Sequence, residues 1–259
     1  MGSTEMRPVA GASTFKRLME QKAAREQWEA ANPEMNEAWN EALREDEQRE
    51  RRAELERRQK HWDVNLPEML RKAGLPLDAV EALHDLRETD TTRAAKRFLE
   101  ASTASEGRFL VYFGRKGVGK TTGAALAARE WLRRYIAERD LATNEYLASM
   151  PVQFALASTF GRLSGYDRDD KEWFERLCSV PFLILDDLGT EHLNPFGQTM
   201  LDELLNRRHG DRLRTVITTN LGKKEFAVRV GDRIFDRVST SGVSCVSVGE
   251  SLRKRTVTP

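Results

Sequence analysis

The chain has 259 residues, enough for one well-buried domain and a smaller appendage. Its 42 Lys and Arg residues almost balance its 41 Asp and Glu residues, so the net charge gives no reason to expect a nucleic acid, an acidic substrate or a membrane as a partner. No run approaches the ~20 apolar residues of a membrane span, and residues 1–19 show no cleavable leader. Cys178 and Cys245 lie far apart without metal-site spacing, which indicates reduced, buried thiols. These features predict a cytoplasmic protein without membrane contact.

Residues 1–62 are predicted to form a charged helical arm. Glu, Arg, Ala and Gln dominate it, and the Asn32-Pro33 pair should end one helix and start another. Residues 41–60 carry almost no apolar stripe, so ion pairs four residues apart would have to support that helix. Such an arm is either a solvated spacer or a docking element for a protein partner. Trp28 and Trp39 favour docking slightly, because large aromatic side chains on a polar helix are usually covered.

Residues 63–106 are predicted to form a small helical connector. Three short helical patterns lie between residues 66 and 101, and turn signals around Gly74 and Thr89 separate them. We expect these helices to lead into the main domain.

From residue 107 the pattern alternates between strand and helix, which predicts an α/β fold with a parallel sheet covered on both faces. The apolar run 109–113 leads directly into G-x-x-x-x-G-K-T at 114–121, and a helix follows. The glycines let backbone N–H groups face phosphates, and the helix directs its positive end at the same anion. Lys120 would reach the β- and γ-phosphates of ATP, and the Thr121 hydroxyl would bind Mg²⁺.

An ordinary glycine-rich turn is the alternative, and the position between a strand and a long helix favours the nucleotide site. The predicted nucleotide contacts are Gly114, Arg115, Lys116, Gly117, Val118, Gly119, Lys120, Thr121 and Thr122.

A second polar element follows the apolar run that begins at Pro181 and ends in Asp186 and Asp187. Ligands bind at the carboxyl ends of strands in open α/β sheets. Asp186 would hold Mg²⁺, directly or through water, and Asp187 would orient or deprotonate the water that attacks the γ-phosphate. Two aspartates after a strand can also merely cap it or the next helix. The spacing from the phosphate loop leaves room for one strand and its helices, which favours the metal site.

Two weaker elements complete the pattern. Asn220 follows a predicted strand and could direct its amide at the γ-phosphate or the attacking water, although an Asn beside Gly222 also forms turns. Arg233 and Arg237 lie four residues apart on one helical face. An arginine offered to a neighbouring subunit's phosphate would act as a finger in trans, and surface ion pairs are the alternative.

The order of these motifs resembles the ATPase core of the DnaC, DnaI and IstB group of AAA+ proteins. The resemblance spans residues 107–255 and rests on GRKGVGKT, FLILDDLGTE, TVITTN, GDRIFDRV and VGESLRKR. It implies a P-loop AAA+ domain over 107–259, with a five-stranded parallel sheet flanked by helices. The roles that it implies are Lys120 and Thr121 as Walker A residues, Asp186 and Asp187 as Walker B residues, Asn220 as sensor 1, Arg237 as the finger with Arg233 as a second candidate, and Arg253 as sensor 2.

The resemblance also implies an ATPase that uses ATP and Mg²⁺ and forms a nucleotide-dependent homo-oligomer, since the finger must come from the next subunit. In helicase loaders the N-terminal region binds the replicative, DnaB-like hexameric helicase, and the core binds single-stranded DNA. An IstB-like transposition helper acting on duplex DNA is the alternative, and the sequence barely separates the two. A small-molecule kinase would have no use for Asn220 and Arg237.

Two features depart from the family pattern. Asp187 stands where many AAA+ proteins have the longer Glu, so we expect slow hydrolysis. The sequence ends at Pro259, soon after the predicted strand 243–248, so we expect no C-terminal lid domain and place Arg253 on a short tail.

Phe160, Arg162 and Tyr166 are the candidate DNA contacts. They follow the predicted strand 152–158, and single-strand binders use aromatic rings beside cations to stack bases. The alternative is that Phe160 and Tyr166 are core residues under a helix.

Overall fold

The computed structural model describes residues 28, 30–101, 108–138, 150–163, 167–189 and 194–247. The chain divides into two compact units, Met1–Arg58 and Gln59–Pro259. The sequence places the end of the arm a few residues later, at 62. The segment predicted as a connector belongs to the second unit.

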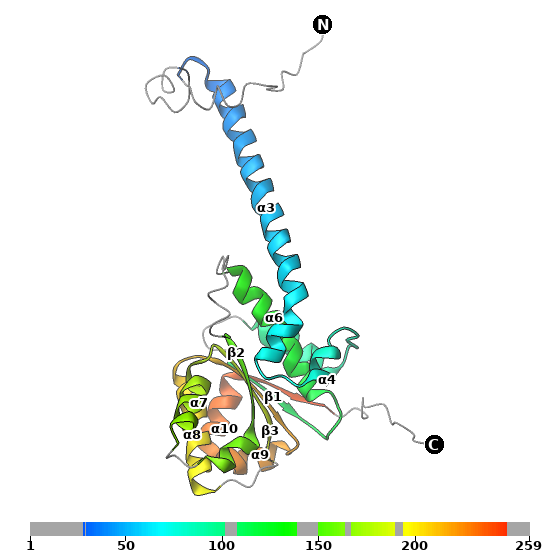
Figure 1. Ribbon diagram of the computed structural model, residues 1–259, viewed down its shortest axis with the longest axis vertical. Helices are drawn as coiled ribbons and strands as arrows, with labels where there is room; N and C mark the ends of the chain where they lie inside the picture. The colour runs from blue at the N-terminus through cyan, green and yellow to red at the C-terminus, as the bar shows by residue number, and fades with distance from the viewer. Residues whose placement is uncertain are drawn as a thin grey trace, which may run out of the picture. The chain divides into compact units, whose positions relative to one another are not determined.

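A sheet forms the centre of the second unit (Figure 1). It has five strands in the order β2-β3-β4-β1-β5. Every pair of neighbouring strands is parallel, which confirms the predicted α/β fold. Parallel neighbours need crossover connections, and helices supply them here. The strands are β1 (Phe109–Phe113), β2 (Val152–Leu156), β3 (Phe182–Leu188), β4 (Arg214–Thr219) and β5 (Gly242–Val246).

Helices cover both faces of the sheet. One face carries the end of α3 (Pro33–Lys72), α4 (Leu77–Glu81), α5 (Asp90–Glu100) and α6 (Lys120–Glu138). The other carries the 3₁₀ helix η2 (Ala157–Arg162), α7 (Arg168–Ser179), α8 (Pro195–Gly210), α9 (Lys223–Val230) and α10 (Asp232–Thr240). None of the described helices is both long and apolar enough to cross a bilayer.

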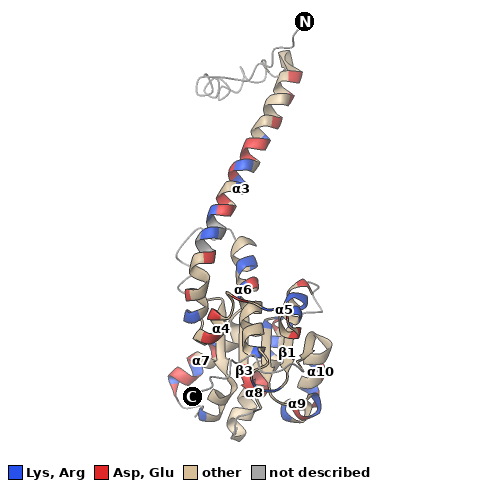
Figure 2. Ribbon diagram, turned by 90° about the vertical axis from the view of Figure 1, so that its right-hand side faces the viewer, with Lys and Arg blue, Asp and Glu red and all other residues tan. Residues whose placement is uncertain are grey.

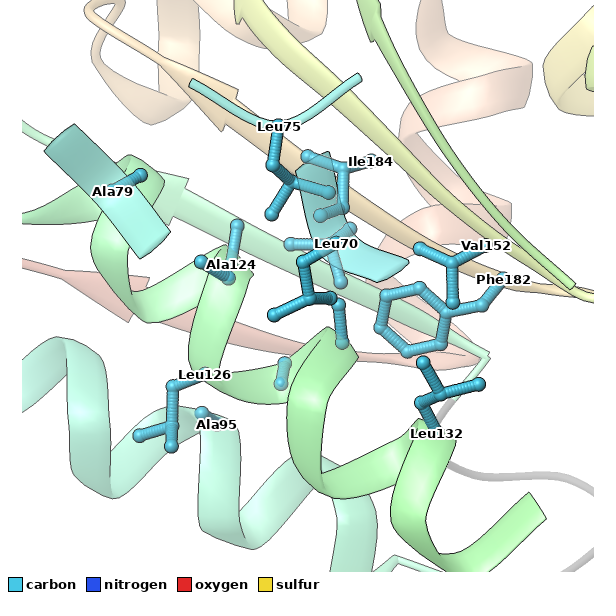
Figure 3. Close-up of a cluster of buried hydrophobic side chains, with 14 of the residues drawn as sticks. Leu70, Leu75, Ala79, Ala95, Ala124, Leu126, Leu132, Val152, Phe182 and Ile184 are labelled. Atoms are coloured by element: carbon cyan, nitrogen blue, oxygen red, sulfur yellow. The ribbon is translucent and has the colours of Figure 1, made fainter. Parts of the chain in front are cut away.

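The strands supply side chains to two cores because successive residues point to opposite faces. Phe182 and Ile184 of β3 enter the first core, and Leu183 and Leu185 enter the second. Figure 3 shows the first core, where Leu70 lies among side chains of the strands and α6. The predicted connector is therefore packed into the same core as the sheet.

Helix α3 begins and ends at predicted signals, but it runs without a break from Pro33 to Lys72, so the first of the three short helices predicted after residue 66 is the end of α3. Pro33 is its first residue, a position that needs no N–H donor. Gly74 adopts φ +94° after the last turn, and its N–H donates to the Arg71 carbonyl at 2.9 Å. The Leu75 N–H donates to the Leu70 carbonyl at 3.1 Å, which completes a Schellman cap.

The character of α3 changes along its length. Between Pro33 and residue 57 its side chains are mostly exposed, and from residue 44 onward Arg residues are interspersed with Asp and Glu (Figure 2). Leu66, Met69 and Leu70 are instead buried in the first core. The first stretch matches the predicted polar helix without an apolar face.

Both cysteines are free and buried, as the sequence predicts. Burial raises the pKa of the Cys178 thiol to about 11 and that of Cys245 above its ordinary value. Neither thiol has the lowered pKa of a reactive cysteine.

Arg208 of α8 is fully buried and joins two elements of the second core. Its guanidinium donates to the carbonyls of Leu177 at 2.6 Å and Val180 at 2.8 Å, at the end of α7. It also donates to the Arg214 carbonyl at 2.6 Å and to the Thr215 hydroxyl at 2.9 Å, in β4. Burial lowers the pKa of Arg208 to about 9, so the side chain stays charged at neutral pH.

We expect Arg208→Met to lower the free energy of unfolding by about 3–5 kcal/mol, because it leaves these buried acceptors unsatisfied. Urea unfolding measures the change. The adjacent Arg207 is the control, since its bidentate pair with Glu175, at 2.7 Å, is largely exposed. Arg207→Met should cost at most about 1 kcal/mol. Equal losses in the two variants would contradict the role given to Arg208.

Candidate nucleotide-binding site

Three strand ends meet at one edge of the sheet. The order β3-β4-β1 brings together the phosphate loop after β1, the two aspartates at the end of β3 and Asn220 after β4. Because β4 lies between β1 and β3, Asn220 lies between the loop and the carboxylates. The structure thus brings the three predicted elements together.

The phosphate loop has the backbone that its glycines permit. Gly114, Gly117 and Gly119 adopt φ values of +145°, +90° and +85°. A Cβ on Gly114 would also lie 2.6 Å from the Ser247 carbonyl oxygen, so this position has no room for a side chain. Lys120 begins α6 and folds back over the loop, where its Nζ donates to the carbonyls of Gly114 at 2.7 Å and Arg115 at 2.9 Å.

Hydrogen bonds link the loop to both other strand ends. The Nζ of Lys120 donates to Asn220 Oδ1 at 2.8 Å, and Asn220 Nδ2 donates to Asp187 Oδ1 at 2.5 Å. Thr121 Oγ1 donates to Asp186 Oδ1 at 3.1 Å. The loop lysine therefore reaches Asp187 through one amide, and the loop threonine reaches Asp186 directly.

An irregularity in β3 brings both aspartates to the same cleft. Strand alternation would place Asp186 and Asp187 on opposite faces. Asp187 instead adopts φ +60°, and the register between β3 and β4 shifts between Leu185 and Leu188. The Asp187 N–H donates to Thr218 Oγ1 at 2.9 Å, which holds this turn. Asp tolerates the left-handed region better than most residues do, and strained backbone of this kind clusters at functional sites.

The environment of Asp186 suits a metal ligand. Burial raises the pKa of Asp186, hydrogen bonds from Thr218 and Thr121 oppose this rise, and the charge of Asp187 adds to it. A divalent cation here would favour the ionised carboxylate. The described residues contain no group of three or more His, Cys, Asp or Glu that could hold a metal. Mg²⁺ at Thr121 and Asp186 would therefore take its other ligands from phosphate and water, as Mg²⁺ commonly does.

The strand ends open into a cleft of about 750 Å³, within the range of small-molecule sites. The predicted residues that line it are Lys116, Gly117, Gly119, Lys120, Thr121, Thr122, Asp186, Asp187 and Asn220. Sequence reasoning missed the rest of the lining, which comprises Thr218 and a wall of Pro76, Asp78, Ala79, Ala82, Asp85, Leu86, Arg87, Thr89, Thr91 and Thr92. The residues around Thr89 were predicted only as a turn between two helices, and nothing in the sequence placed the following helix at the phosphate loop.

Side-chain contacts fix α5 against the loop helix. The Tyr112 hydroxyl donates to the Thr91 carbonyl at 2.9 Å. Gly123 of α6 lies beneath this contact, where a Cβ would be 2.9 Å from Thr91 Cβ and 3.0 Å from the Tyr112 ring. The absence of a side chain at Gly123 therefore lets the first turn of α5 line the cleft.

We expect Gly123→Ala to displace this turn and to weaken nucleotide binding about tenfold, since overpacking typically costs about 1–3 kcal/mol. Titration with a fluorescent ATP analogue measures the affinity. Gly210→Ala is the matched control, because it also places alanine in a helix and its Cβ would meet nothing within 4 Å. Equal affinities for the two variants would show that the packing at Gly123 does not control the cleft.

The remaining predicted residues lie outside the cleft. Gly114 and Arg115 offer carbonyls to Lys120, and Val118, within the loop, has a buried side chain. Neither Arg233 nor Arg237 of α10 is among the described residues that line it. Arg253 lies outside the described residues.

The predicted DNA contacts need one correction. Phe160 is fully buried in η2, and its ring lies 5.3 Å from that of Trp173. It is a core residue and offers no face on which a base could stack, so this prediction was wrong. Arg162 is exposed, and Tyr166 lies outside the described residues.

Comparison with known proteins gives distant relatives. No protein-family model matches the chain. It is 21% identical over 144 residues to the replicative helicase loader DnaC of Escherichia coli K12, which covers 56% of this chain and 55% of DnaC. It is 28% identical over 99 residues to the uncharacterized protein YdaV of the same strain, with 37% and 40% covered. The chain thus spans about half the length of the curated relatives that it matches.

Among solved structures, one from Streptococcus pyogenes serotype M3, described as a primosome component, is similar with a TM-score of 0.51. The two are 20% identical, and the similarity covers 69% of this chain and 92% of that one. This likeness concerns the fold alone. The resemblance seen in the motifs is confirmed to this extent: the chain is similar in sequence to DnaC helicase loaders, and its five-stranded parallel sheet with flanking helices is similar in fold to the Streptococcus pyogenes structure.

Proposed function

We propose that this chain is an ATP-dependent loader of a replicative hexameric helicase. The observation that carries the ATPase part is the hydrogen-bonded set Lys120, Asn220 and Asp187 in the cleft, with Thr121 and Asp186 beside it. The similarity to DnaC over about half of the chain supports the loader part.

The residues of the cleft have distinct proposed tasks in hydrolysis. The loop N–H groups bind the phosphates of ATP, and Lys120 exchanges its carbonyl and amide partners for the β- and γ-phosphates. Thr121 and Asp186 hold Mg²⁺, which neutralises charge on the phosphates when it is bound. Asp187 orients the attacking water or accepts its proton, and Asn220 fixes Asp187 relative to the γ-phosphate. The wall beginning at Pro76 then receives the nucleoside.

Assembly is proposed to complete the site. Arg237 of one subunit would contact the γ-phosphate bound by its neighbour, so ATP favours a homo-oligomer. Single-stranded DNA would bind the core, with Arg162 as the remaining described candidate. Since residues 66–99 help to form the first core, the unit Met1–Arg58 is the better candidate for binding the helicase.

The test is ATP turnover by the full chain without DNA, with single-stranded DNA and with duplex DNA, together with capture of a replicative helicase by the full chain. Stimulation by single strands and capture of the helicase would support the proposal. Stimulation by duplex and capture of a transposase would favour the IstB-like alternative. Absence of turnover in all three conditions would contradict the ATPase assignment.

We expect Asp187→Asn to bind ATP normally and to hydrolyse it at least about 100-fold more slowly, since general-base catalysis contributes about 10²–10⁴-fold. Asn also tolerates φ +60°, so the backbone should keep its conformation. Filter binding and phosphate release measure the two properties separately. Asp169→Asn, which changes an exposed carboxylate in the first turn of α7, is the control. Normal turnover by Asp187→Asn would exclude Asp187 as the base.

A further inference from the structure

Two arginines of α10 converge on one amide oxygen. Arg237 donates through Nη1 to Asn206 Oδ1, and Arg233 donates through Nη2 to the same atom at 3.4 Å. Asn206 belongs to α8, so this contact links two helices of the second core. No ion pair between described residues involves either arginine, so the surface pairs that the sequence offered as an alternative are not formed.

We propose that Asn206 is a positioning residue that holds Arg237 in the orientation in which it reaches the neighbouring subunit's nucleotide. The inference rests on the proposed function, because it assigns a task to Asn206 only if Arg237 acts in trans. Asn206 itself touches no nucleotide. It orients Arg237 of its own subunit, and that arginine contacts the nucleotide bound by the neighbouring subunit.

The surroundings fix the backbone of α10 but not the guanidinium. Ile234 and Val238 are buried, and Phe235 packs edge-on against Phe226 with ring centroids 6.3 Å apart. The side chain of Arg237 is only partly buried, and these contacts do not restrict its rotamers. A hydrogen bond to Asn206 removes part of that freedom before the phosphate arrives, and such preorganisation lowers the cost of the reaction step.

The chemistry of Asn206 suits this task. A neutral amide oxygen orients a guanidinium without neutralising it, so the full positive charge stays available to a phosphate. The neighbourhood is also positive. The pKa of His209, one turn further along α8, is lowered by burial and by the charges of Arg237 and Arg108. A carboxylate at position 206 would hold the arginine but compete with the phosphate for it.

Mixed oligomers test the effect of Asn206 in the subunit that supplies the arginine finger, here called the donor, separately from the subunit that hydrolyses ATP, here called the acceptor. The acceptor is Arg237→Ala, which keeps an intact nucleotide cleft and lacks the finger. The donor is Asp187→Asn, which keeps the finger and lacks the base. Two further donors combine Asp187→Asn with Asn206→Leu, which has similar shape and no acceptor, or with Asn206→Asp, which keeps the acceptor. ATP turnover with single-stranded DNA is measured for each mixture after subtraction of each variant alone, and melting temperatures establish that every donor is folded.

We expect the mixture with the Asp187→Asn donor to turn over ATP at least about tenfold faster than Arg237→Ala alone. This gain is smaller than the full effect of an arginine finger, which is about 10³-fold or more. The Asn206→Leu donor should restore less than about a tenth of that gain and the Asn206→Asp donor an intermediate amount, with an unchanged KM for ATP because the acceptor cleft is intact. Full restoration by Asn206→Leu would overturn the role of Asn206 while leaving the finger in place. Absence of gain in every mixture would overturn the finger in trans and this inference with it.

Discussion

Replacing Lys120 by alanine is expected to remove ATP binding at ordinary concentrations. The Lys120 ammonium lies at the centre of the cleft, within 2.9 Å of the carbonyls of Gly114 and Arg115 and of Asn220 Oδ1. It is the buried cation that would meet the β- and γ-phosphates. Two lost charge-assisted hydrogen bonds of about 1.5–3 kcal/mol each lower the affinity about 100-fold or more.

Titration with a fluorescent ATP analogue, with Mg²⁺ present, measures the loss. Lys171→Ala is the matched control, because Lys171 carries the same charge on an exposed position of α7, outside the cleft. Its affinity should equal that of the wild type. The melting temperature of Lys120→Ala without nucleotide must also be followed, since the variant leaves two loop carbonyls without this donor. Near-normal binding by a folded Lys120→Ala would remove the basis for the nucleotide site.

The sequence could predict which strand ends carry the site because that information is local. An apolar run followed by glycines, or by carboxylates, marks both a strand and its functional end, and parallel strands bring such ends to one edge. Lys120, Asp186 and Asn220 meet for this reason. The hydrogen bond from Lys120 to Asn220 depends on β4 lying beside β1, and the order of the strands was not predicted from the sequence.

The wall of the cleft that begins at Pro76 could not be predicted, because its position depends on tertiary packing. Thr89 caps α5 through its hydroxyl, which accepts from the Thr92 N–H at 3.3 Å, whereas the sequence pattern around Thr89 indicated only a turn between two helices. The position of that cap beside the phosphate loop depends on Tyr112 and Gly123, which are more than 20 residues away along the chain. A segment predicted as a connector thus became part of the site.

Asp187 and Phe160 illustrate two further limits. The rule that strand residues alternate between faces would separate Asp187 from Asp186, and only the left-handed backbone and the register shift bring them together. For Phe160, an aromatic ring beside an arginine has the same sequence pattern in a DNA-binding surface and in a core. The burial of Phe160 against Trp173 decides between them, and burial is a property of the folded chain.

Arg237→Ala is expected to leave ATP binding intact and to lower turnover in the presence of single-stranded DNA about 10³-fold, the lower end of the effect of arginine fingers. Binding should persist because Arg237 lies on α10 and does not line the cleft of its own subunit. Turnover should fall because the γ-phosphate of the neighbour loses the cation that stabilises its developing charge. Arg237 is the better candidate of the two, since it is partly buried and held by Asn206, whereas Arg233 is exposed and bonds the same atom at 3.4 Å.

Arg233→Ala is the matched control, one helical turn away with the same charge. We expect it to change turnover by less than about threefold, as for an exposed surface cation. Phosphate release with single-stranded DNA and a binding titration for each variant separate catalysis from affinity. If Arg237→Ala hydrolyses ATP normally and Arg233→Ala does not, Arg233 is the finger. Normal hydrolysis by both variants would mean that neither arginine of α10 acts on a neighbour's nucleotide, and the assembly would then have to complete its sites by other residues.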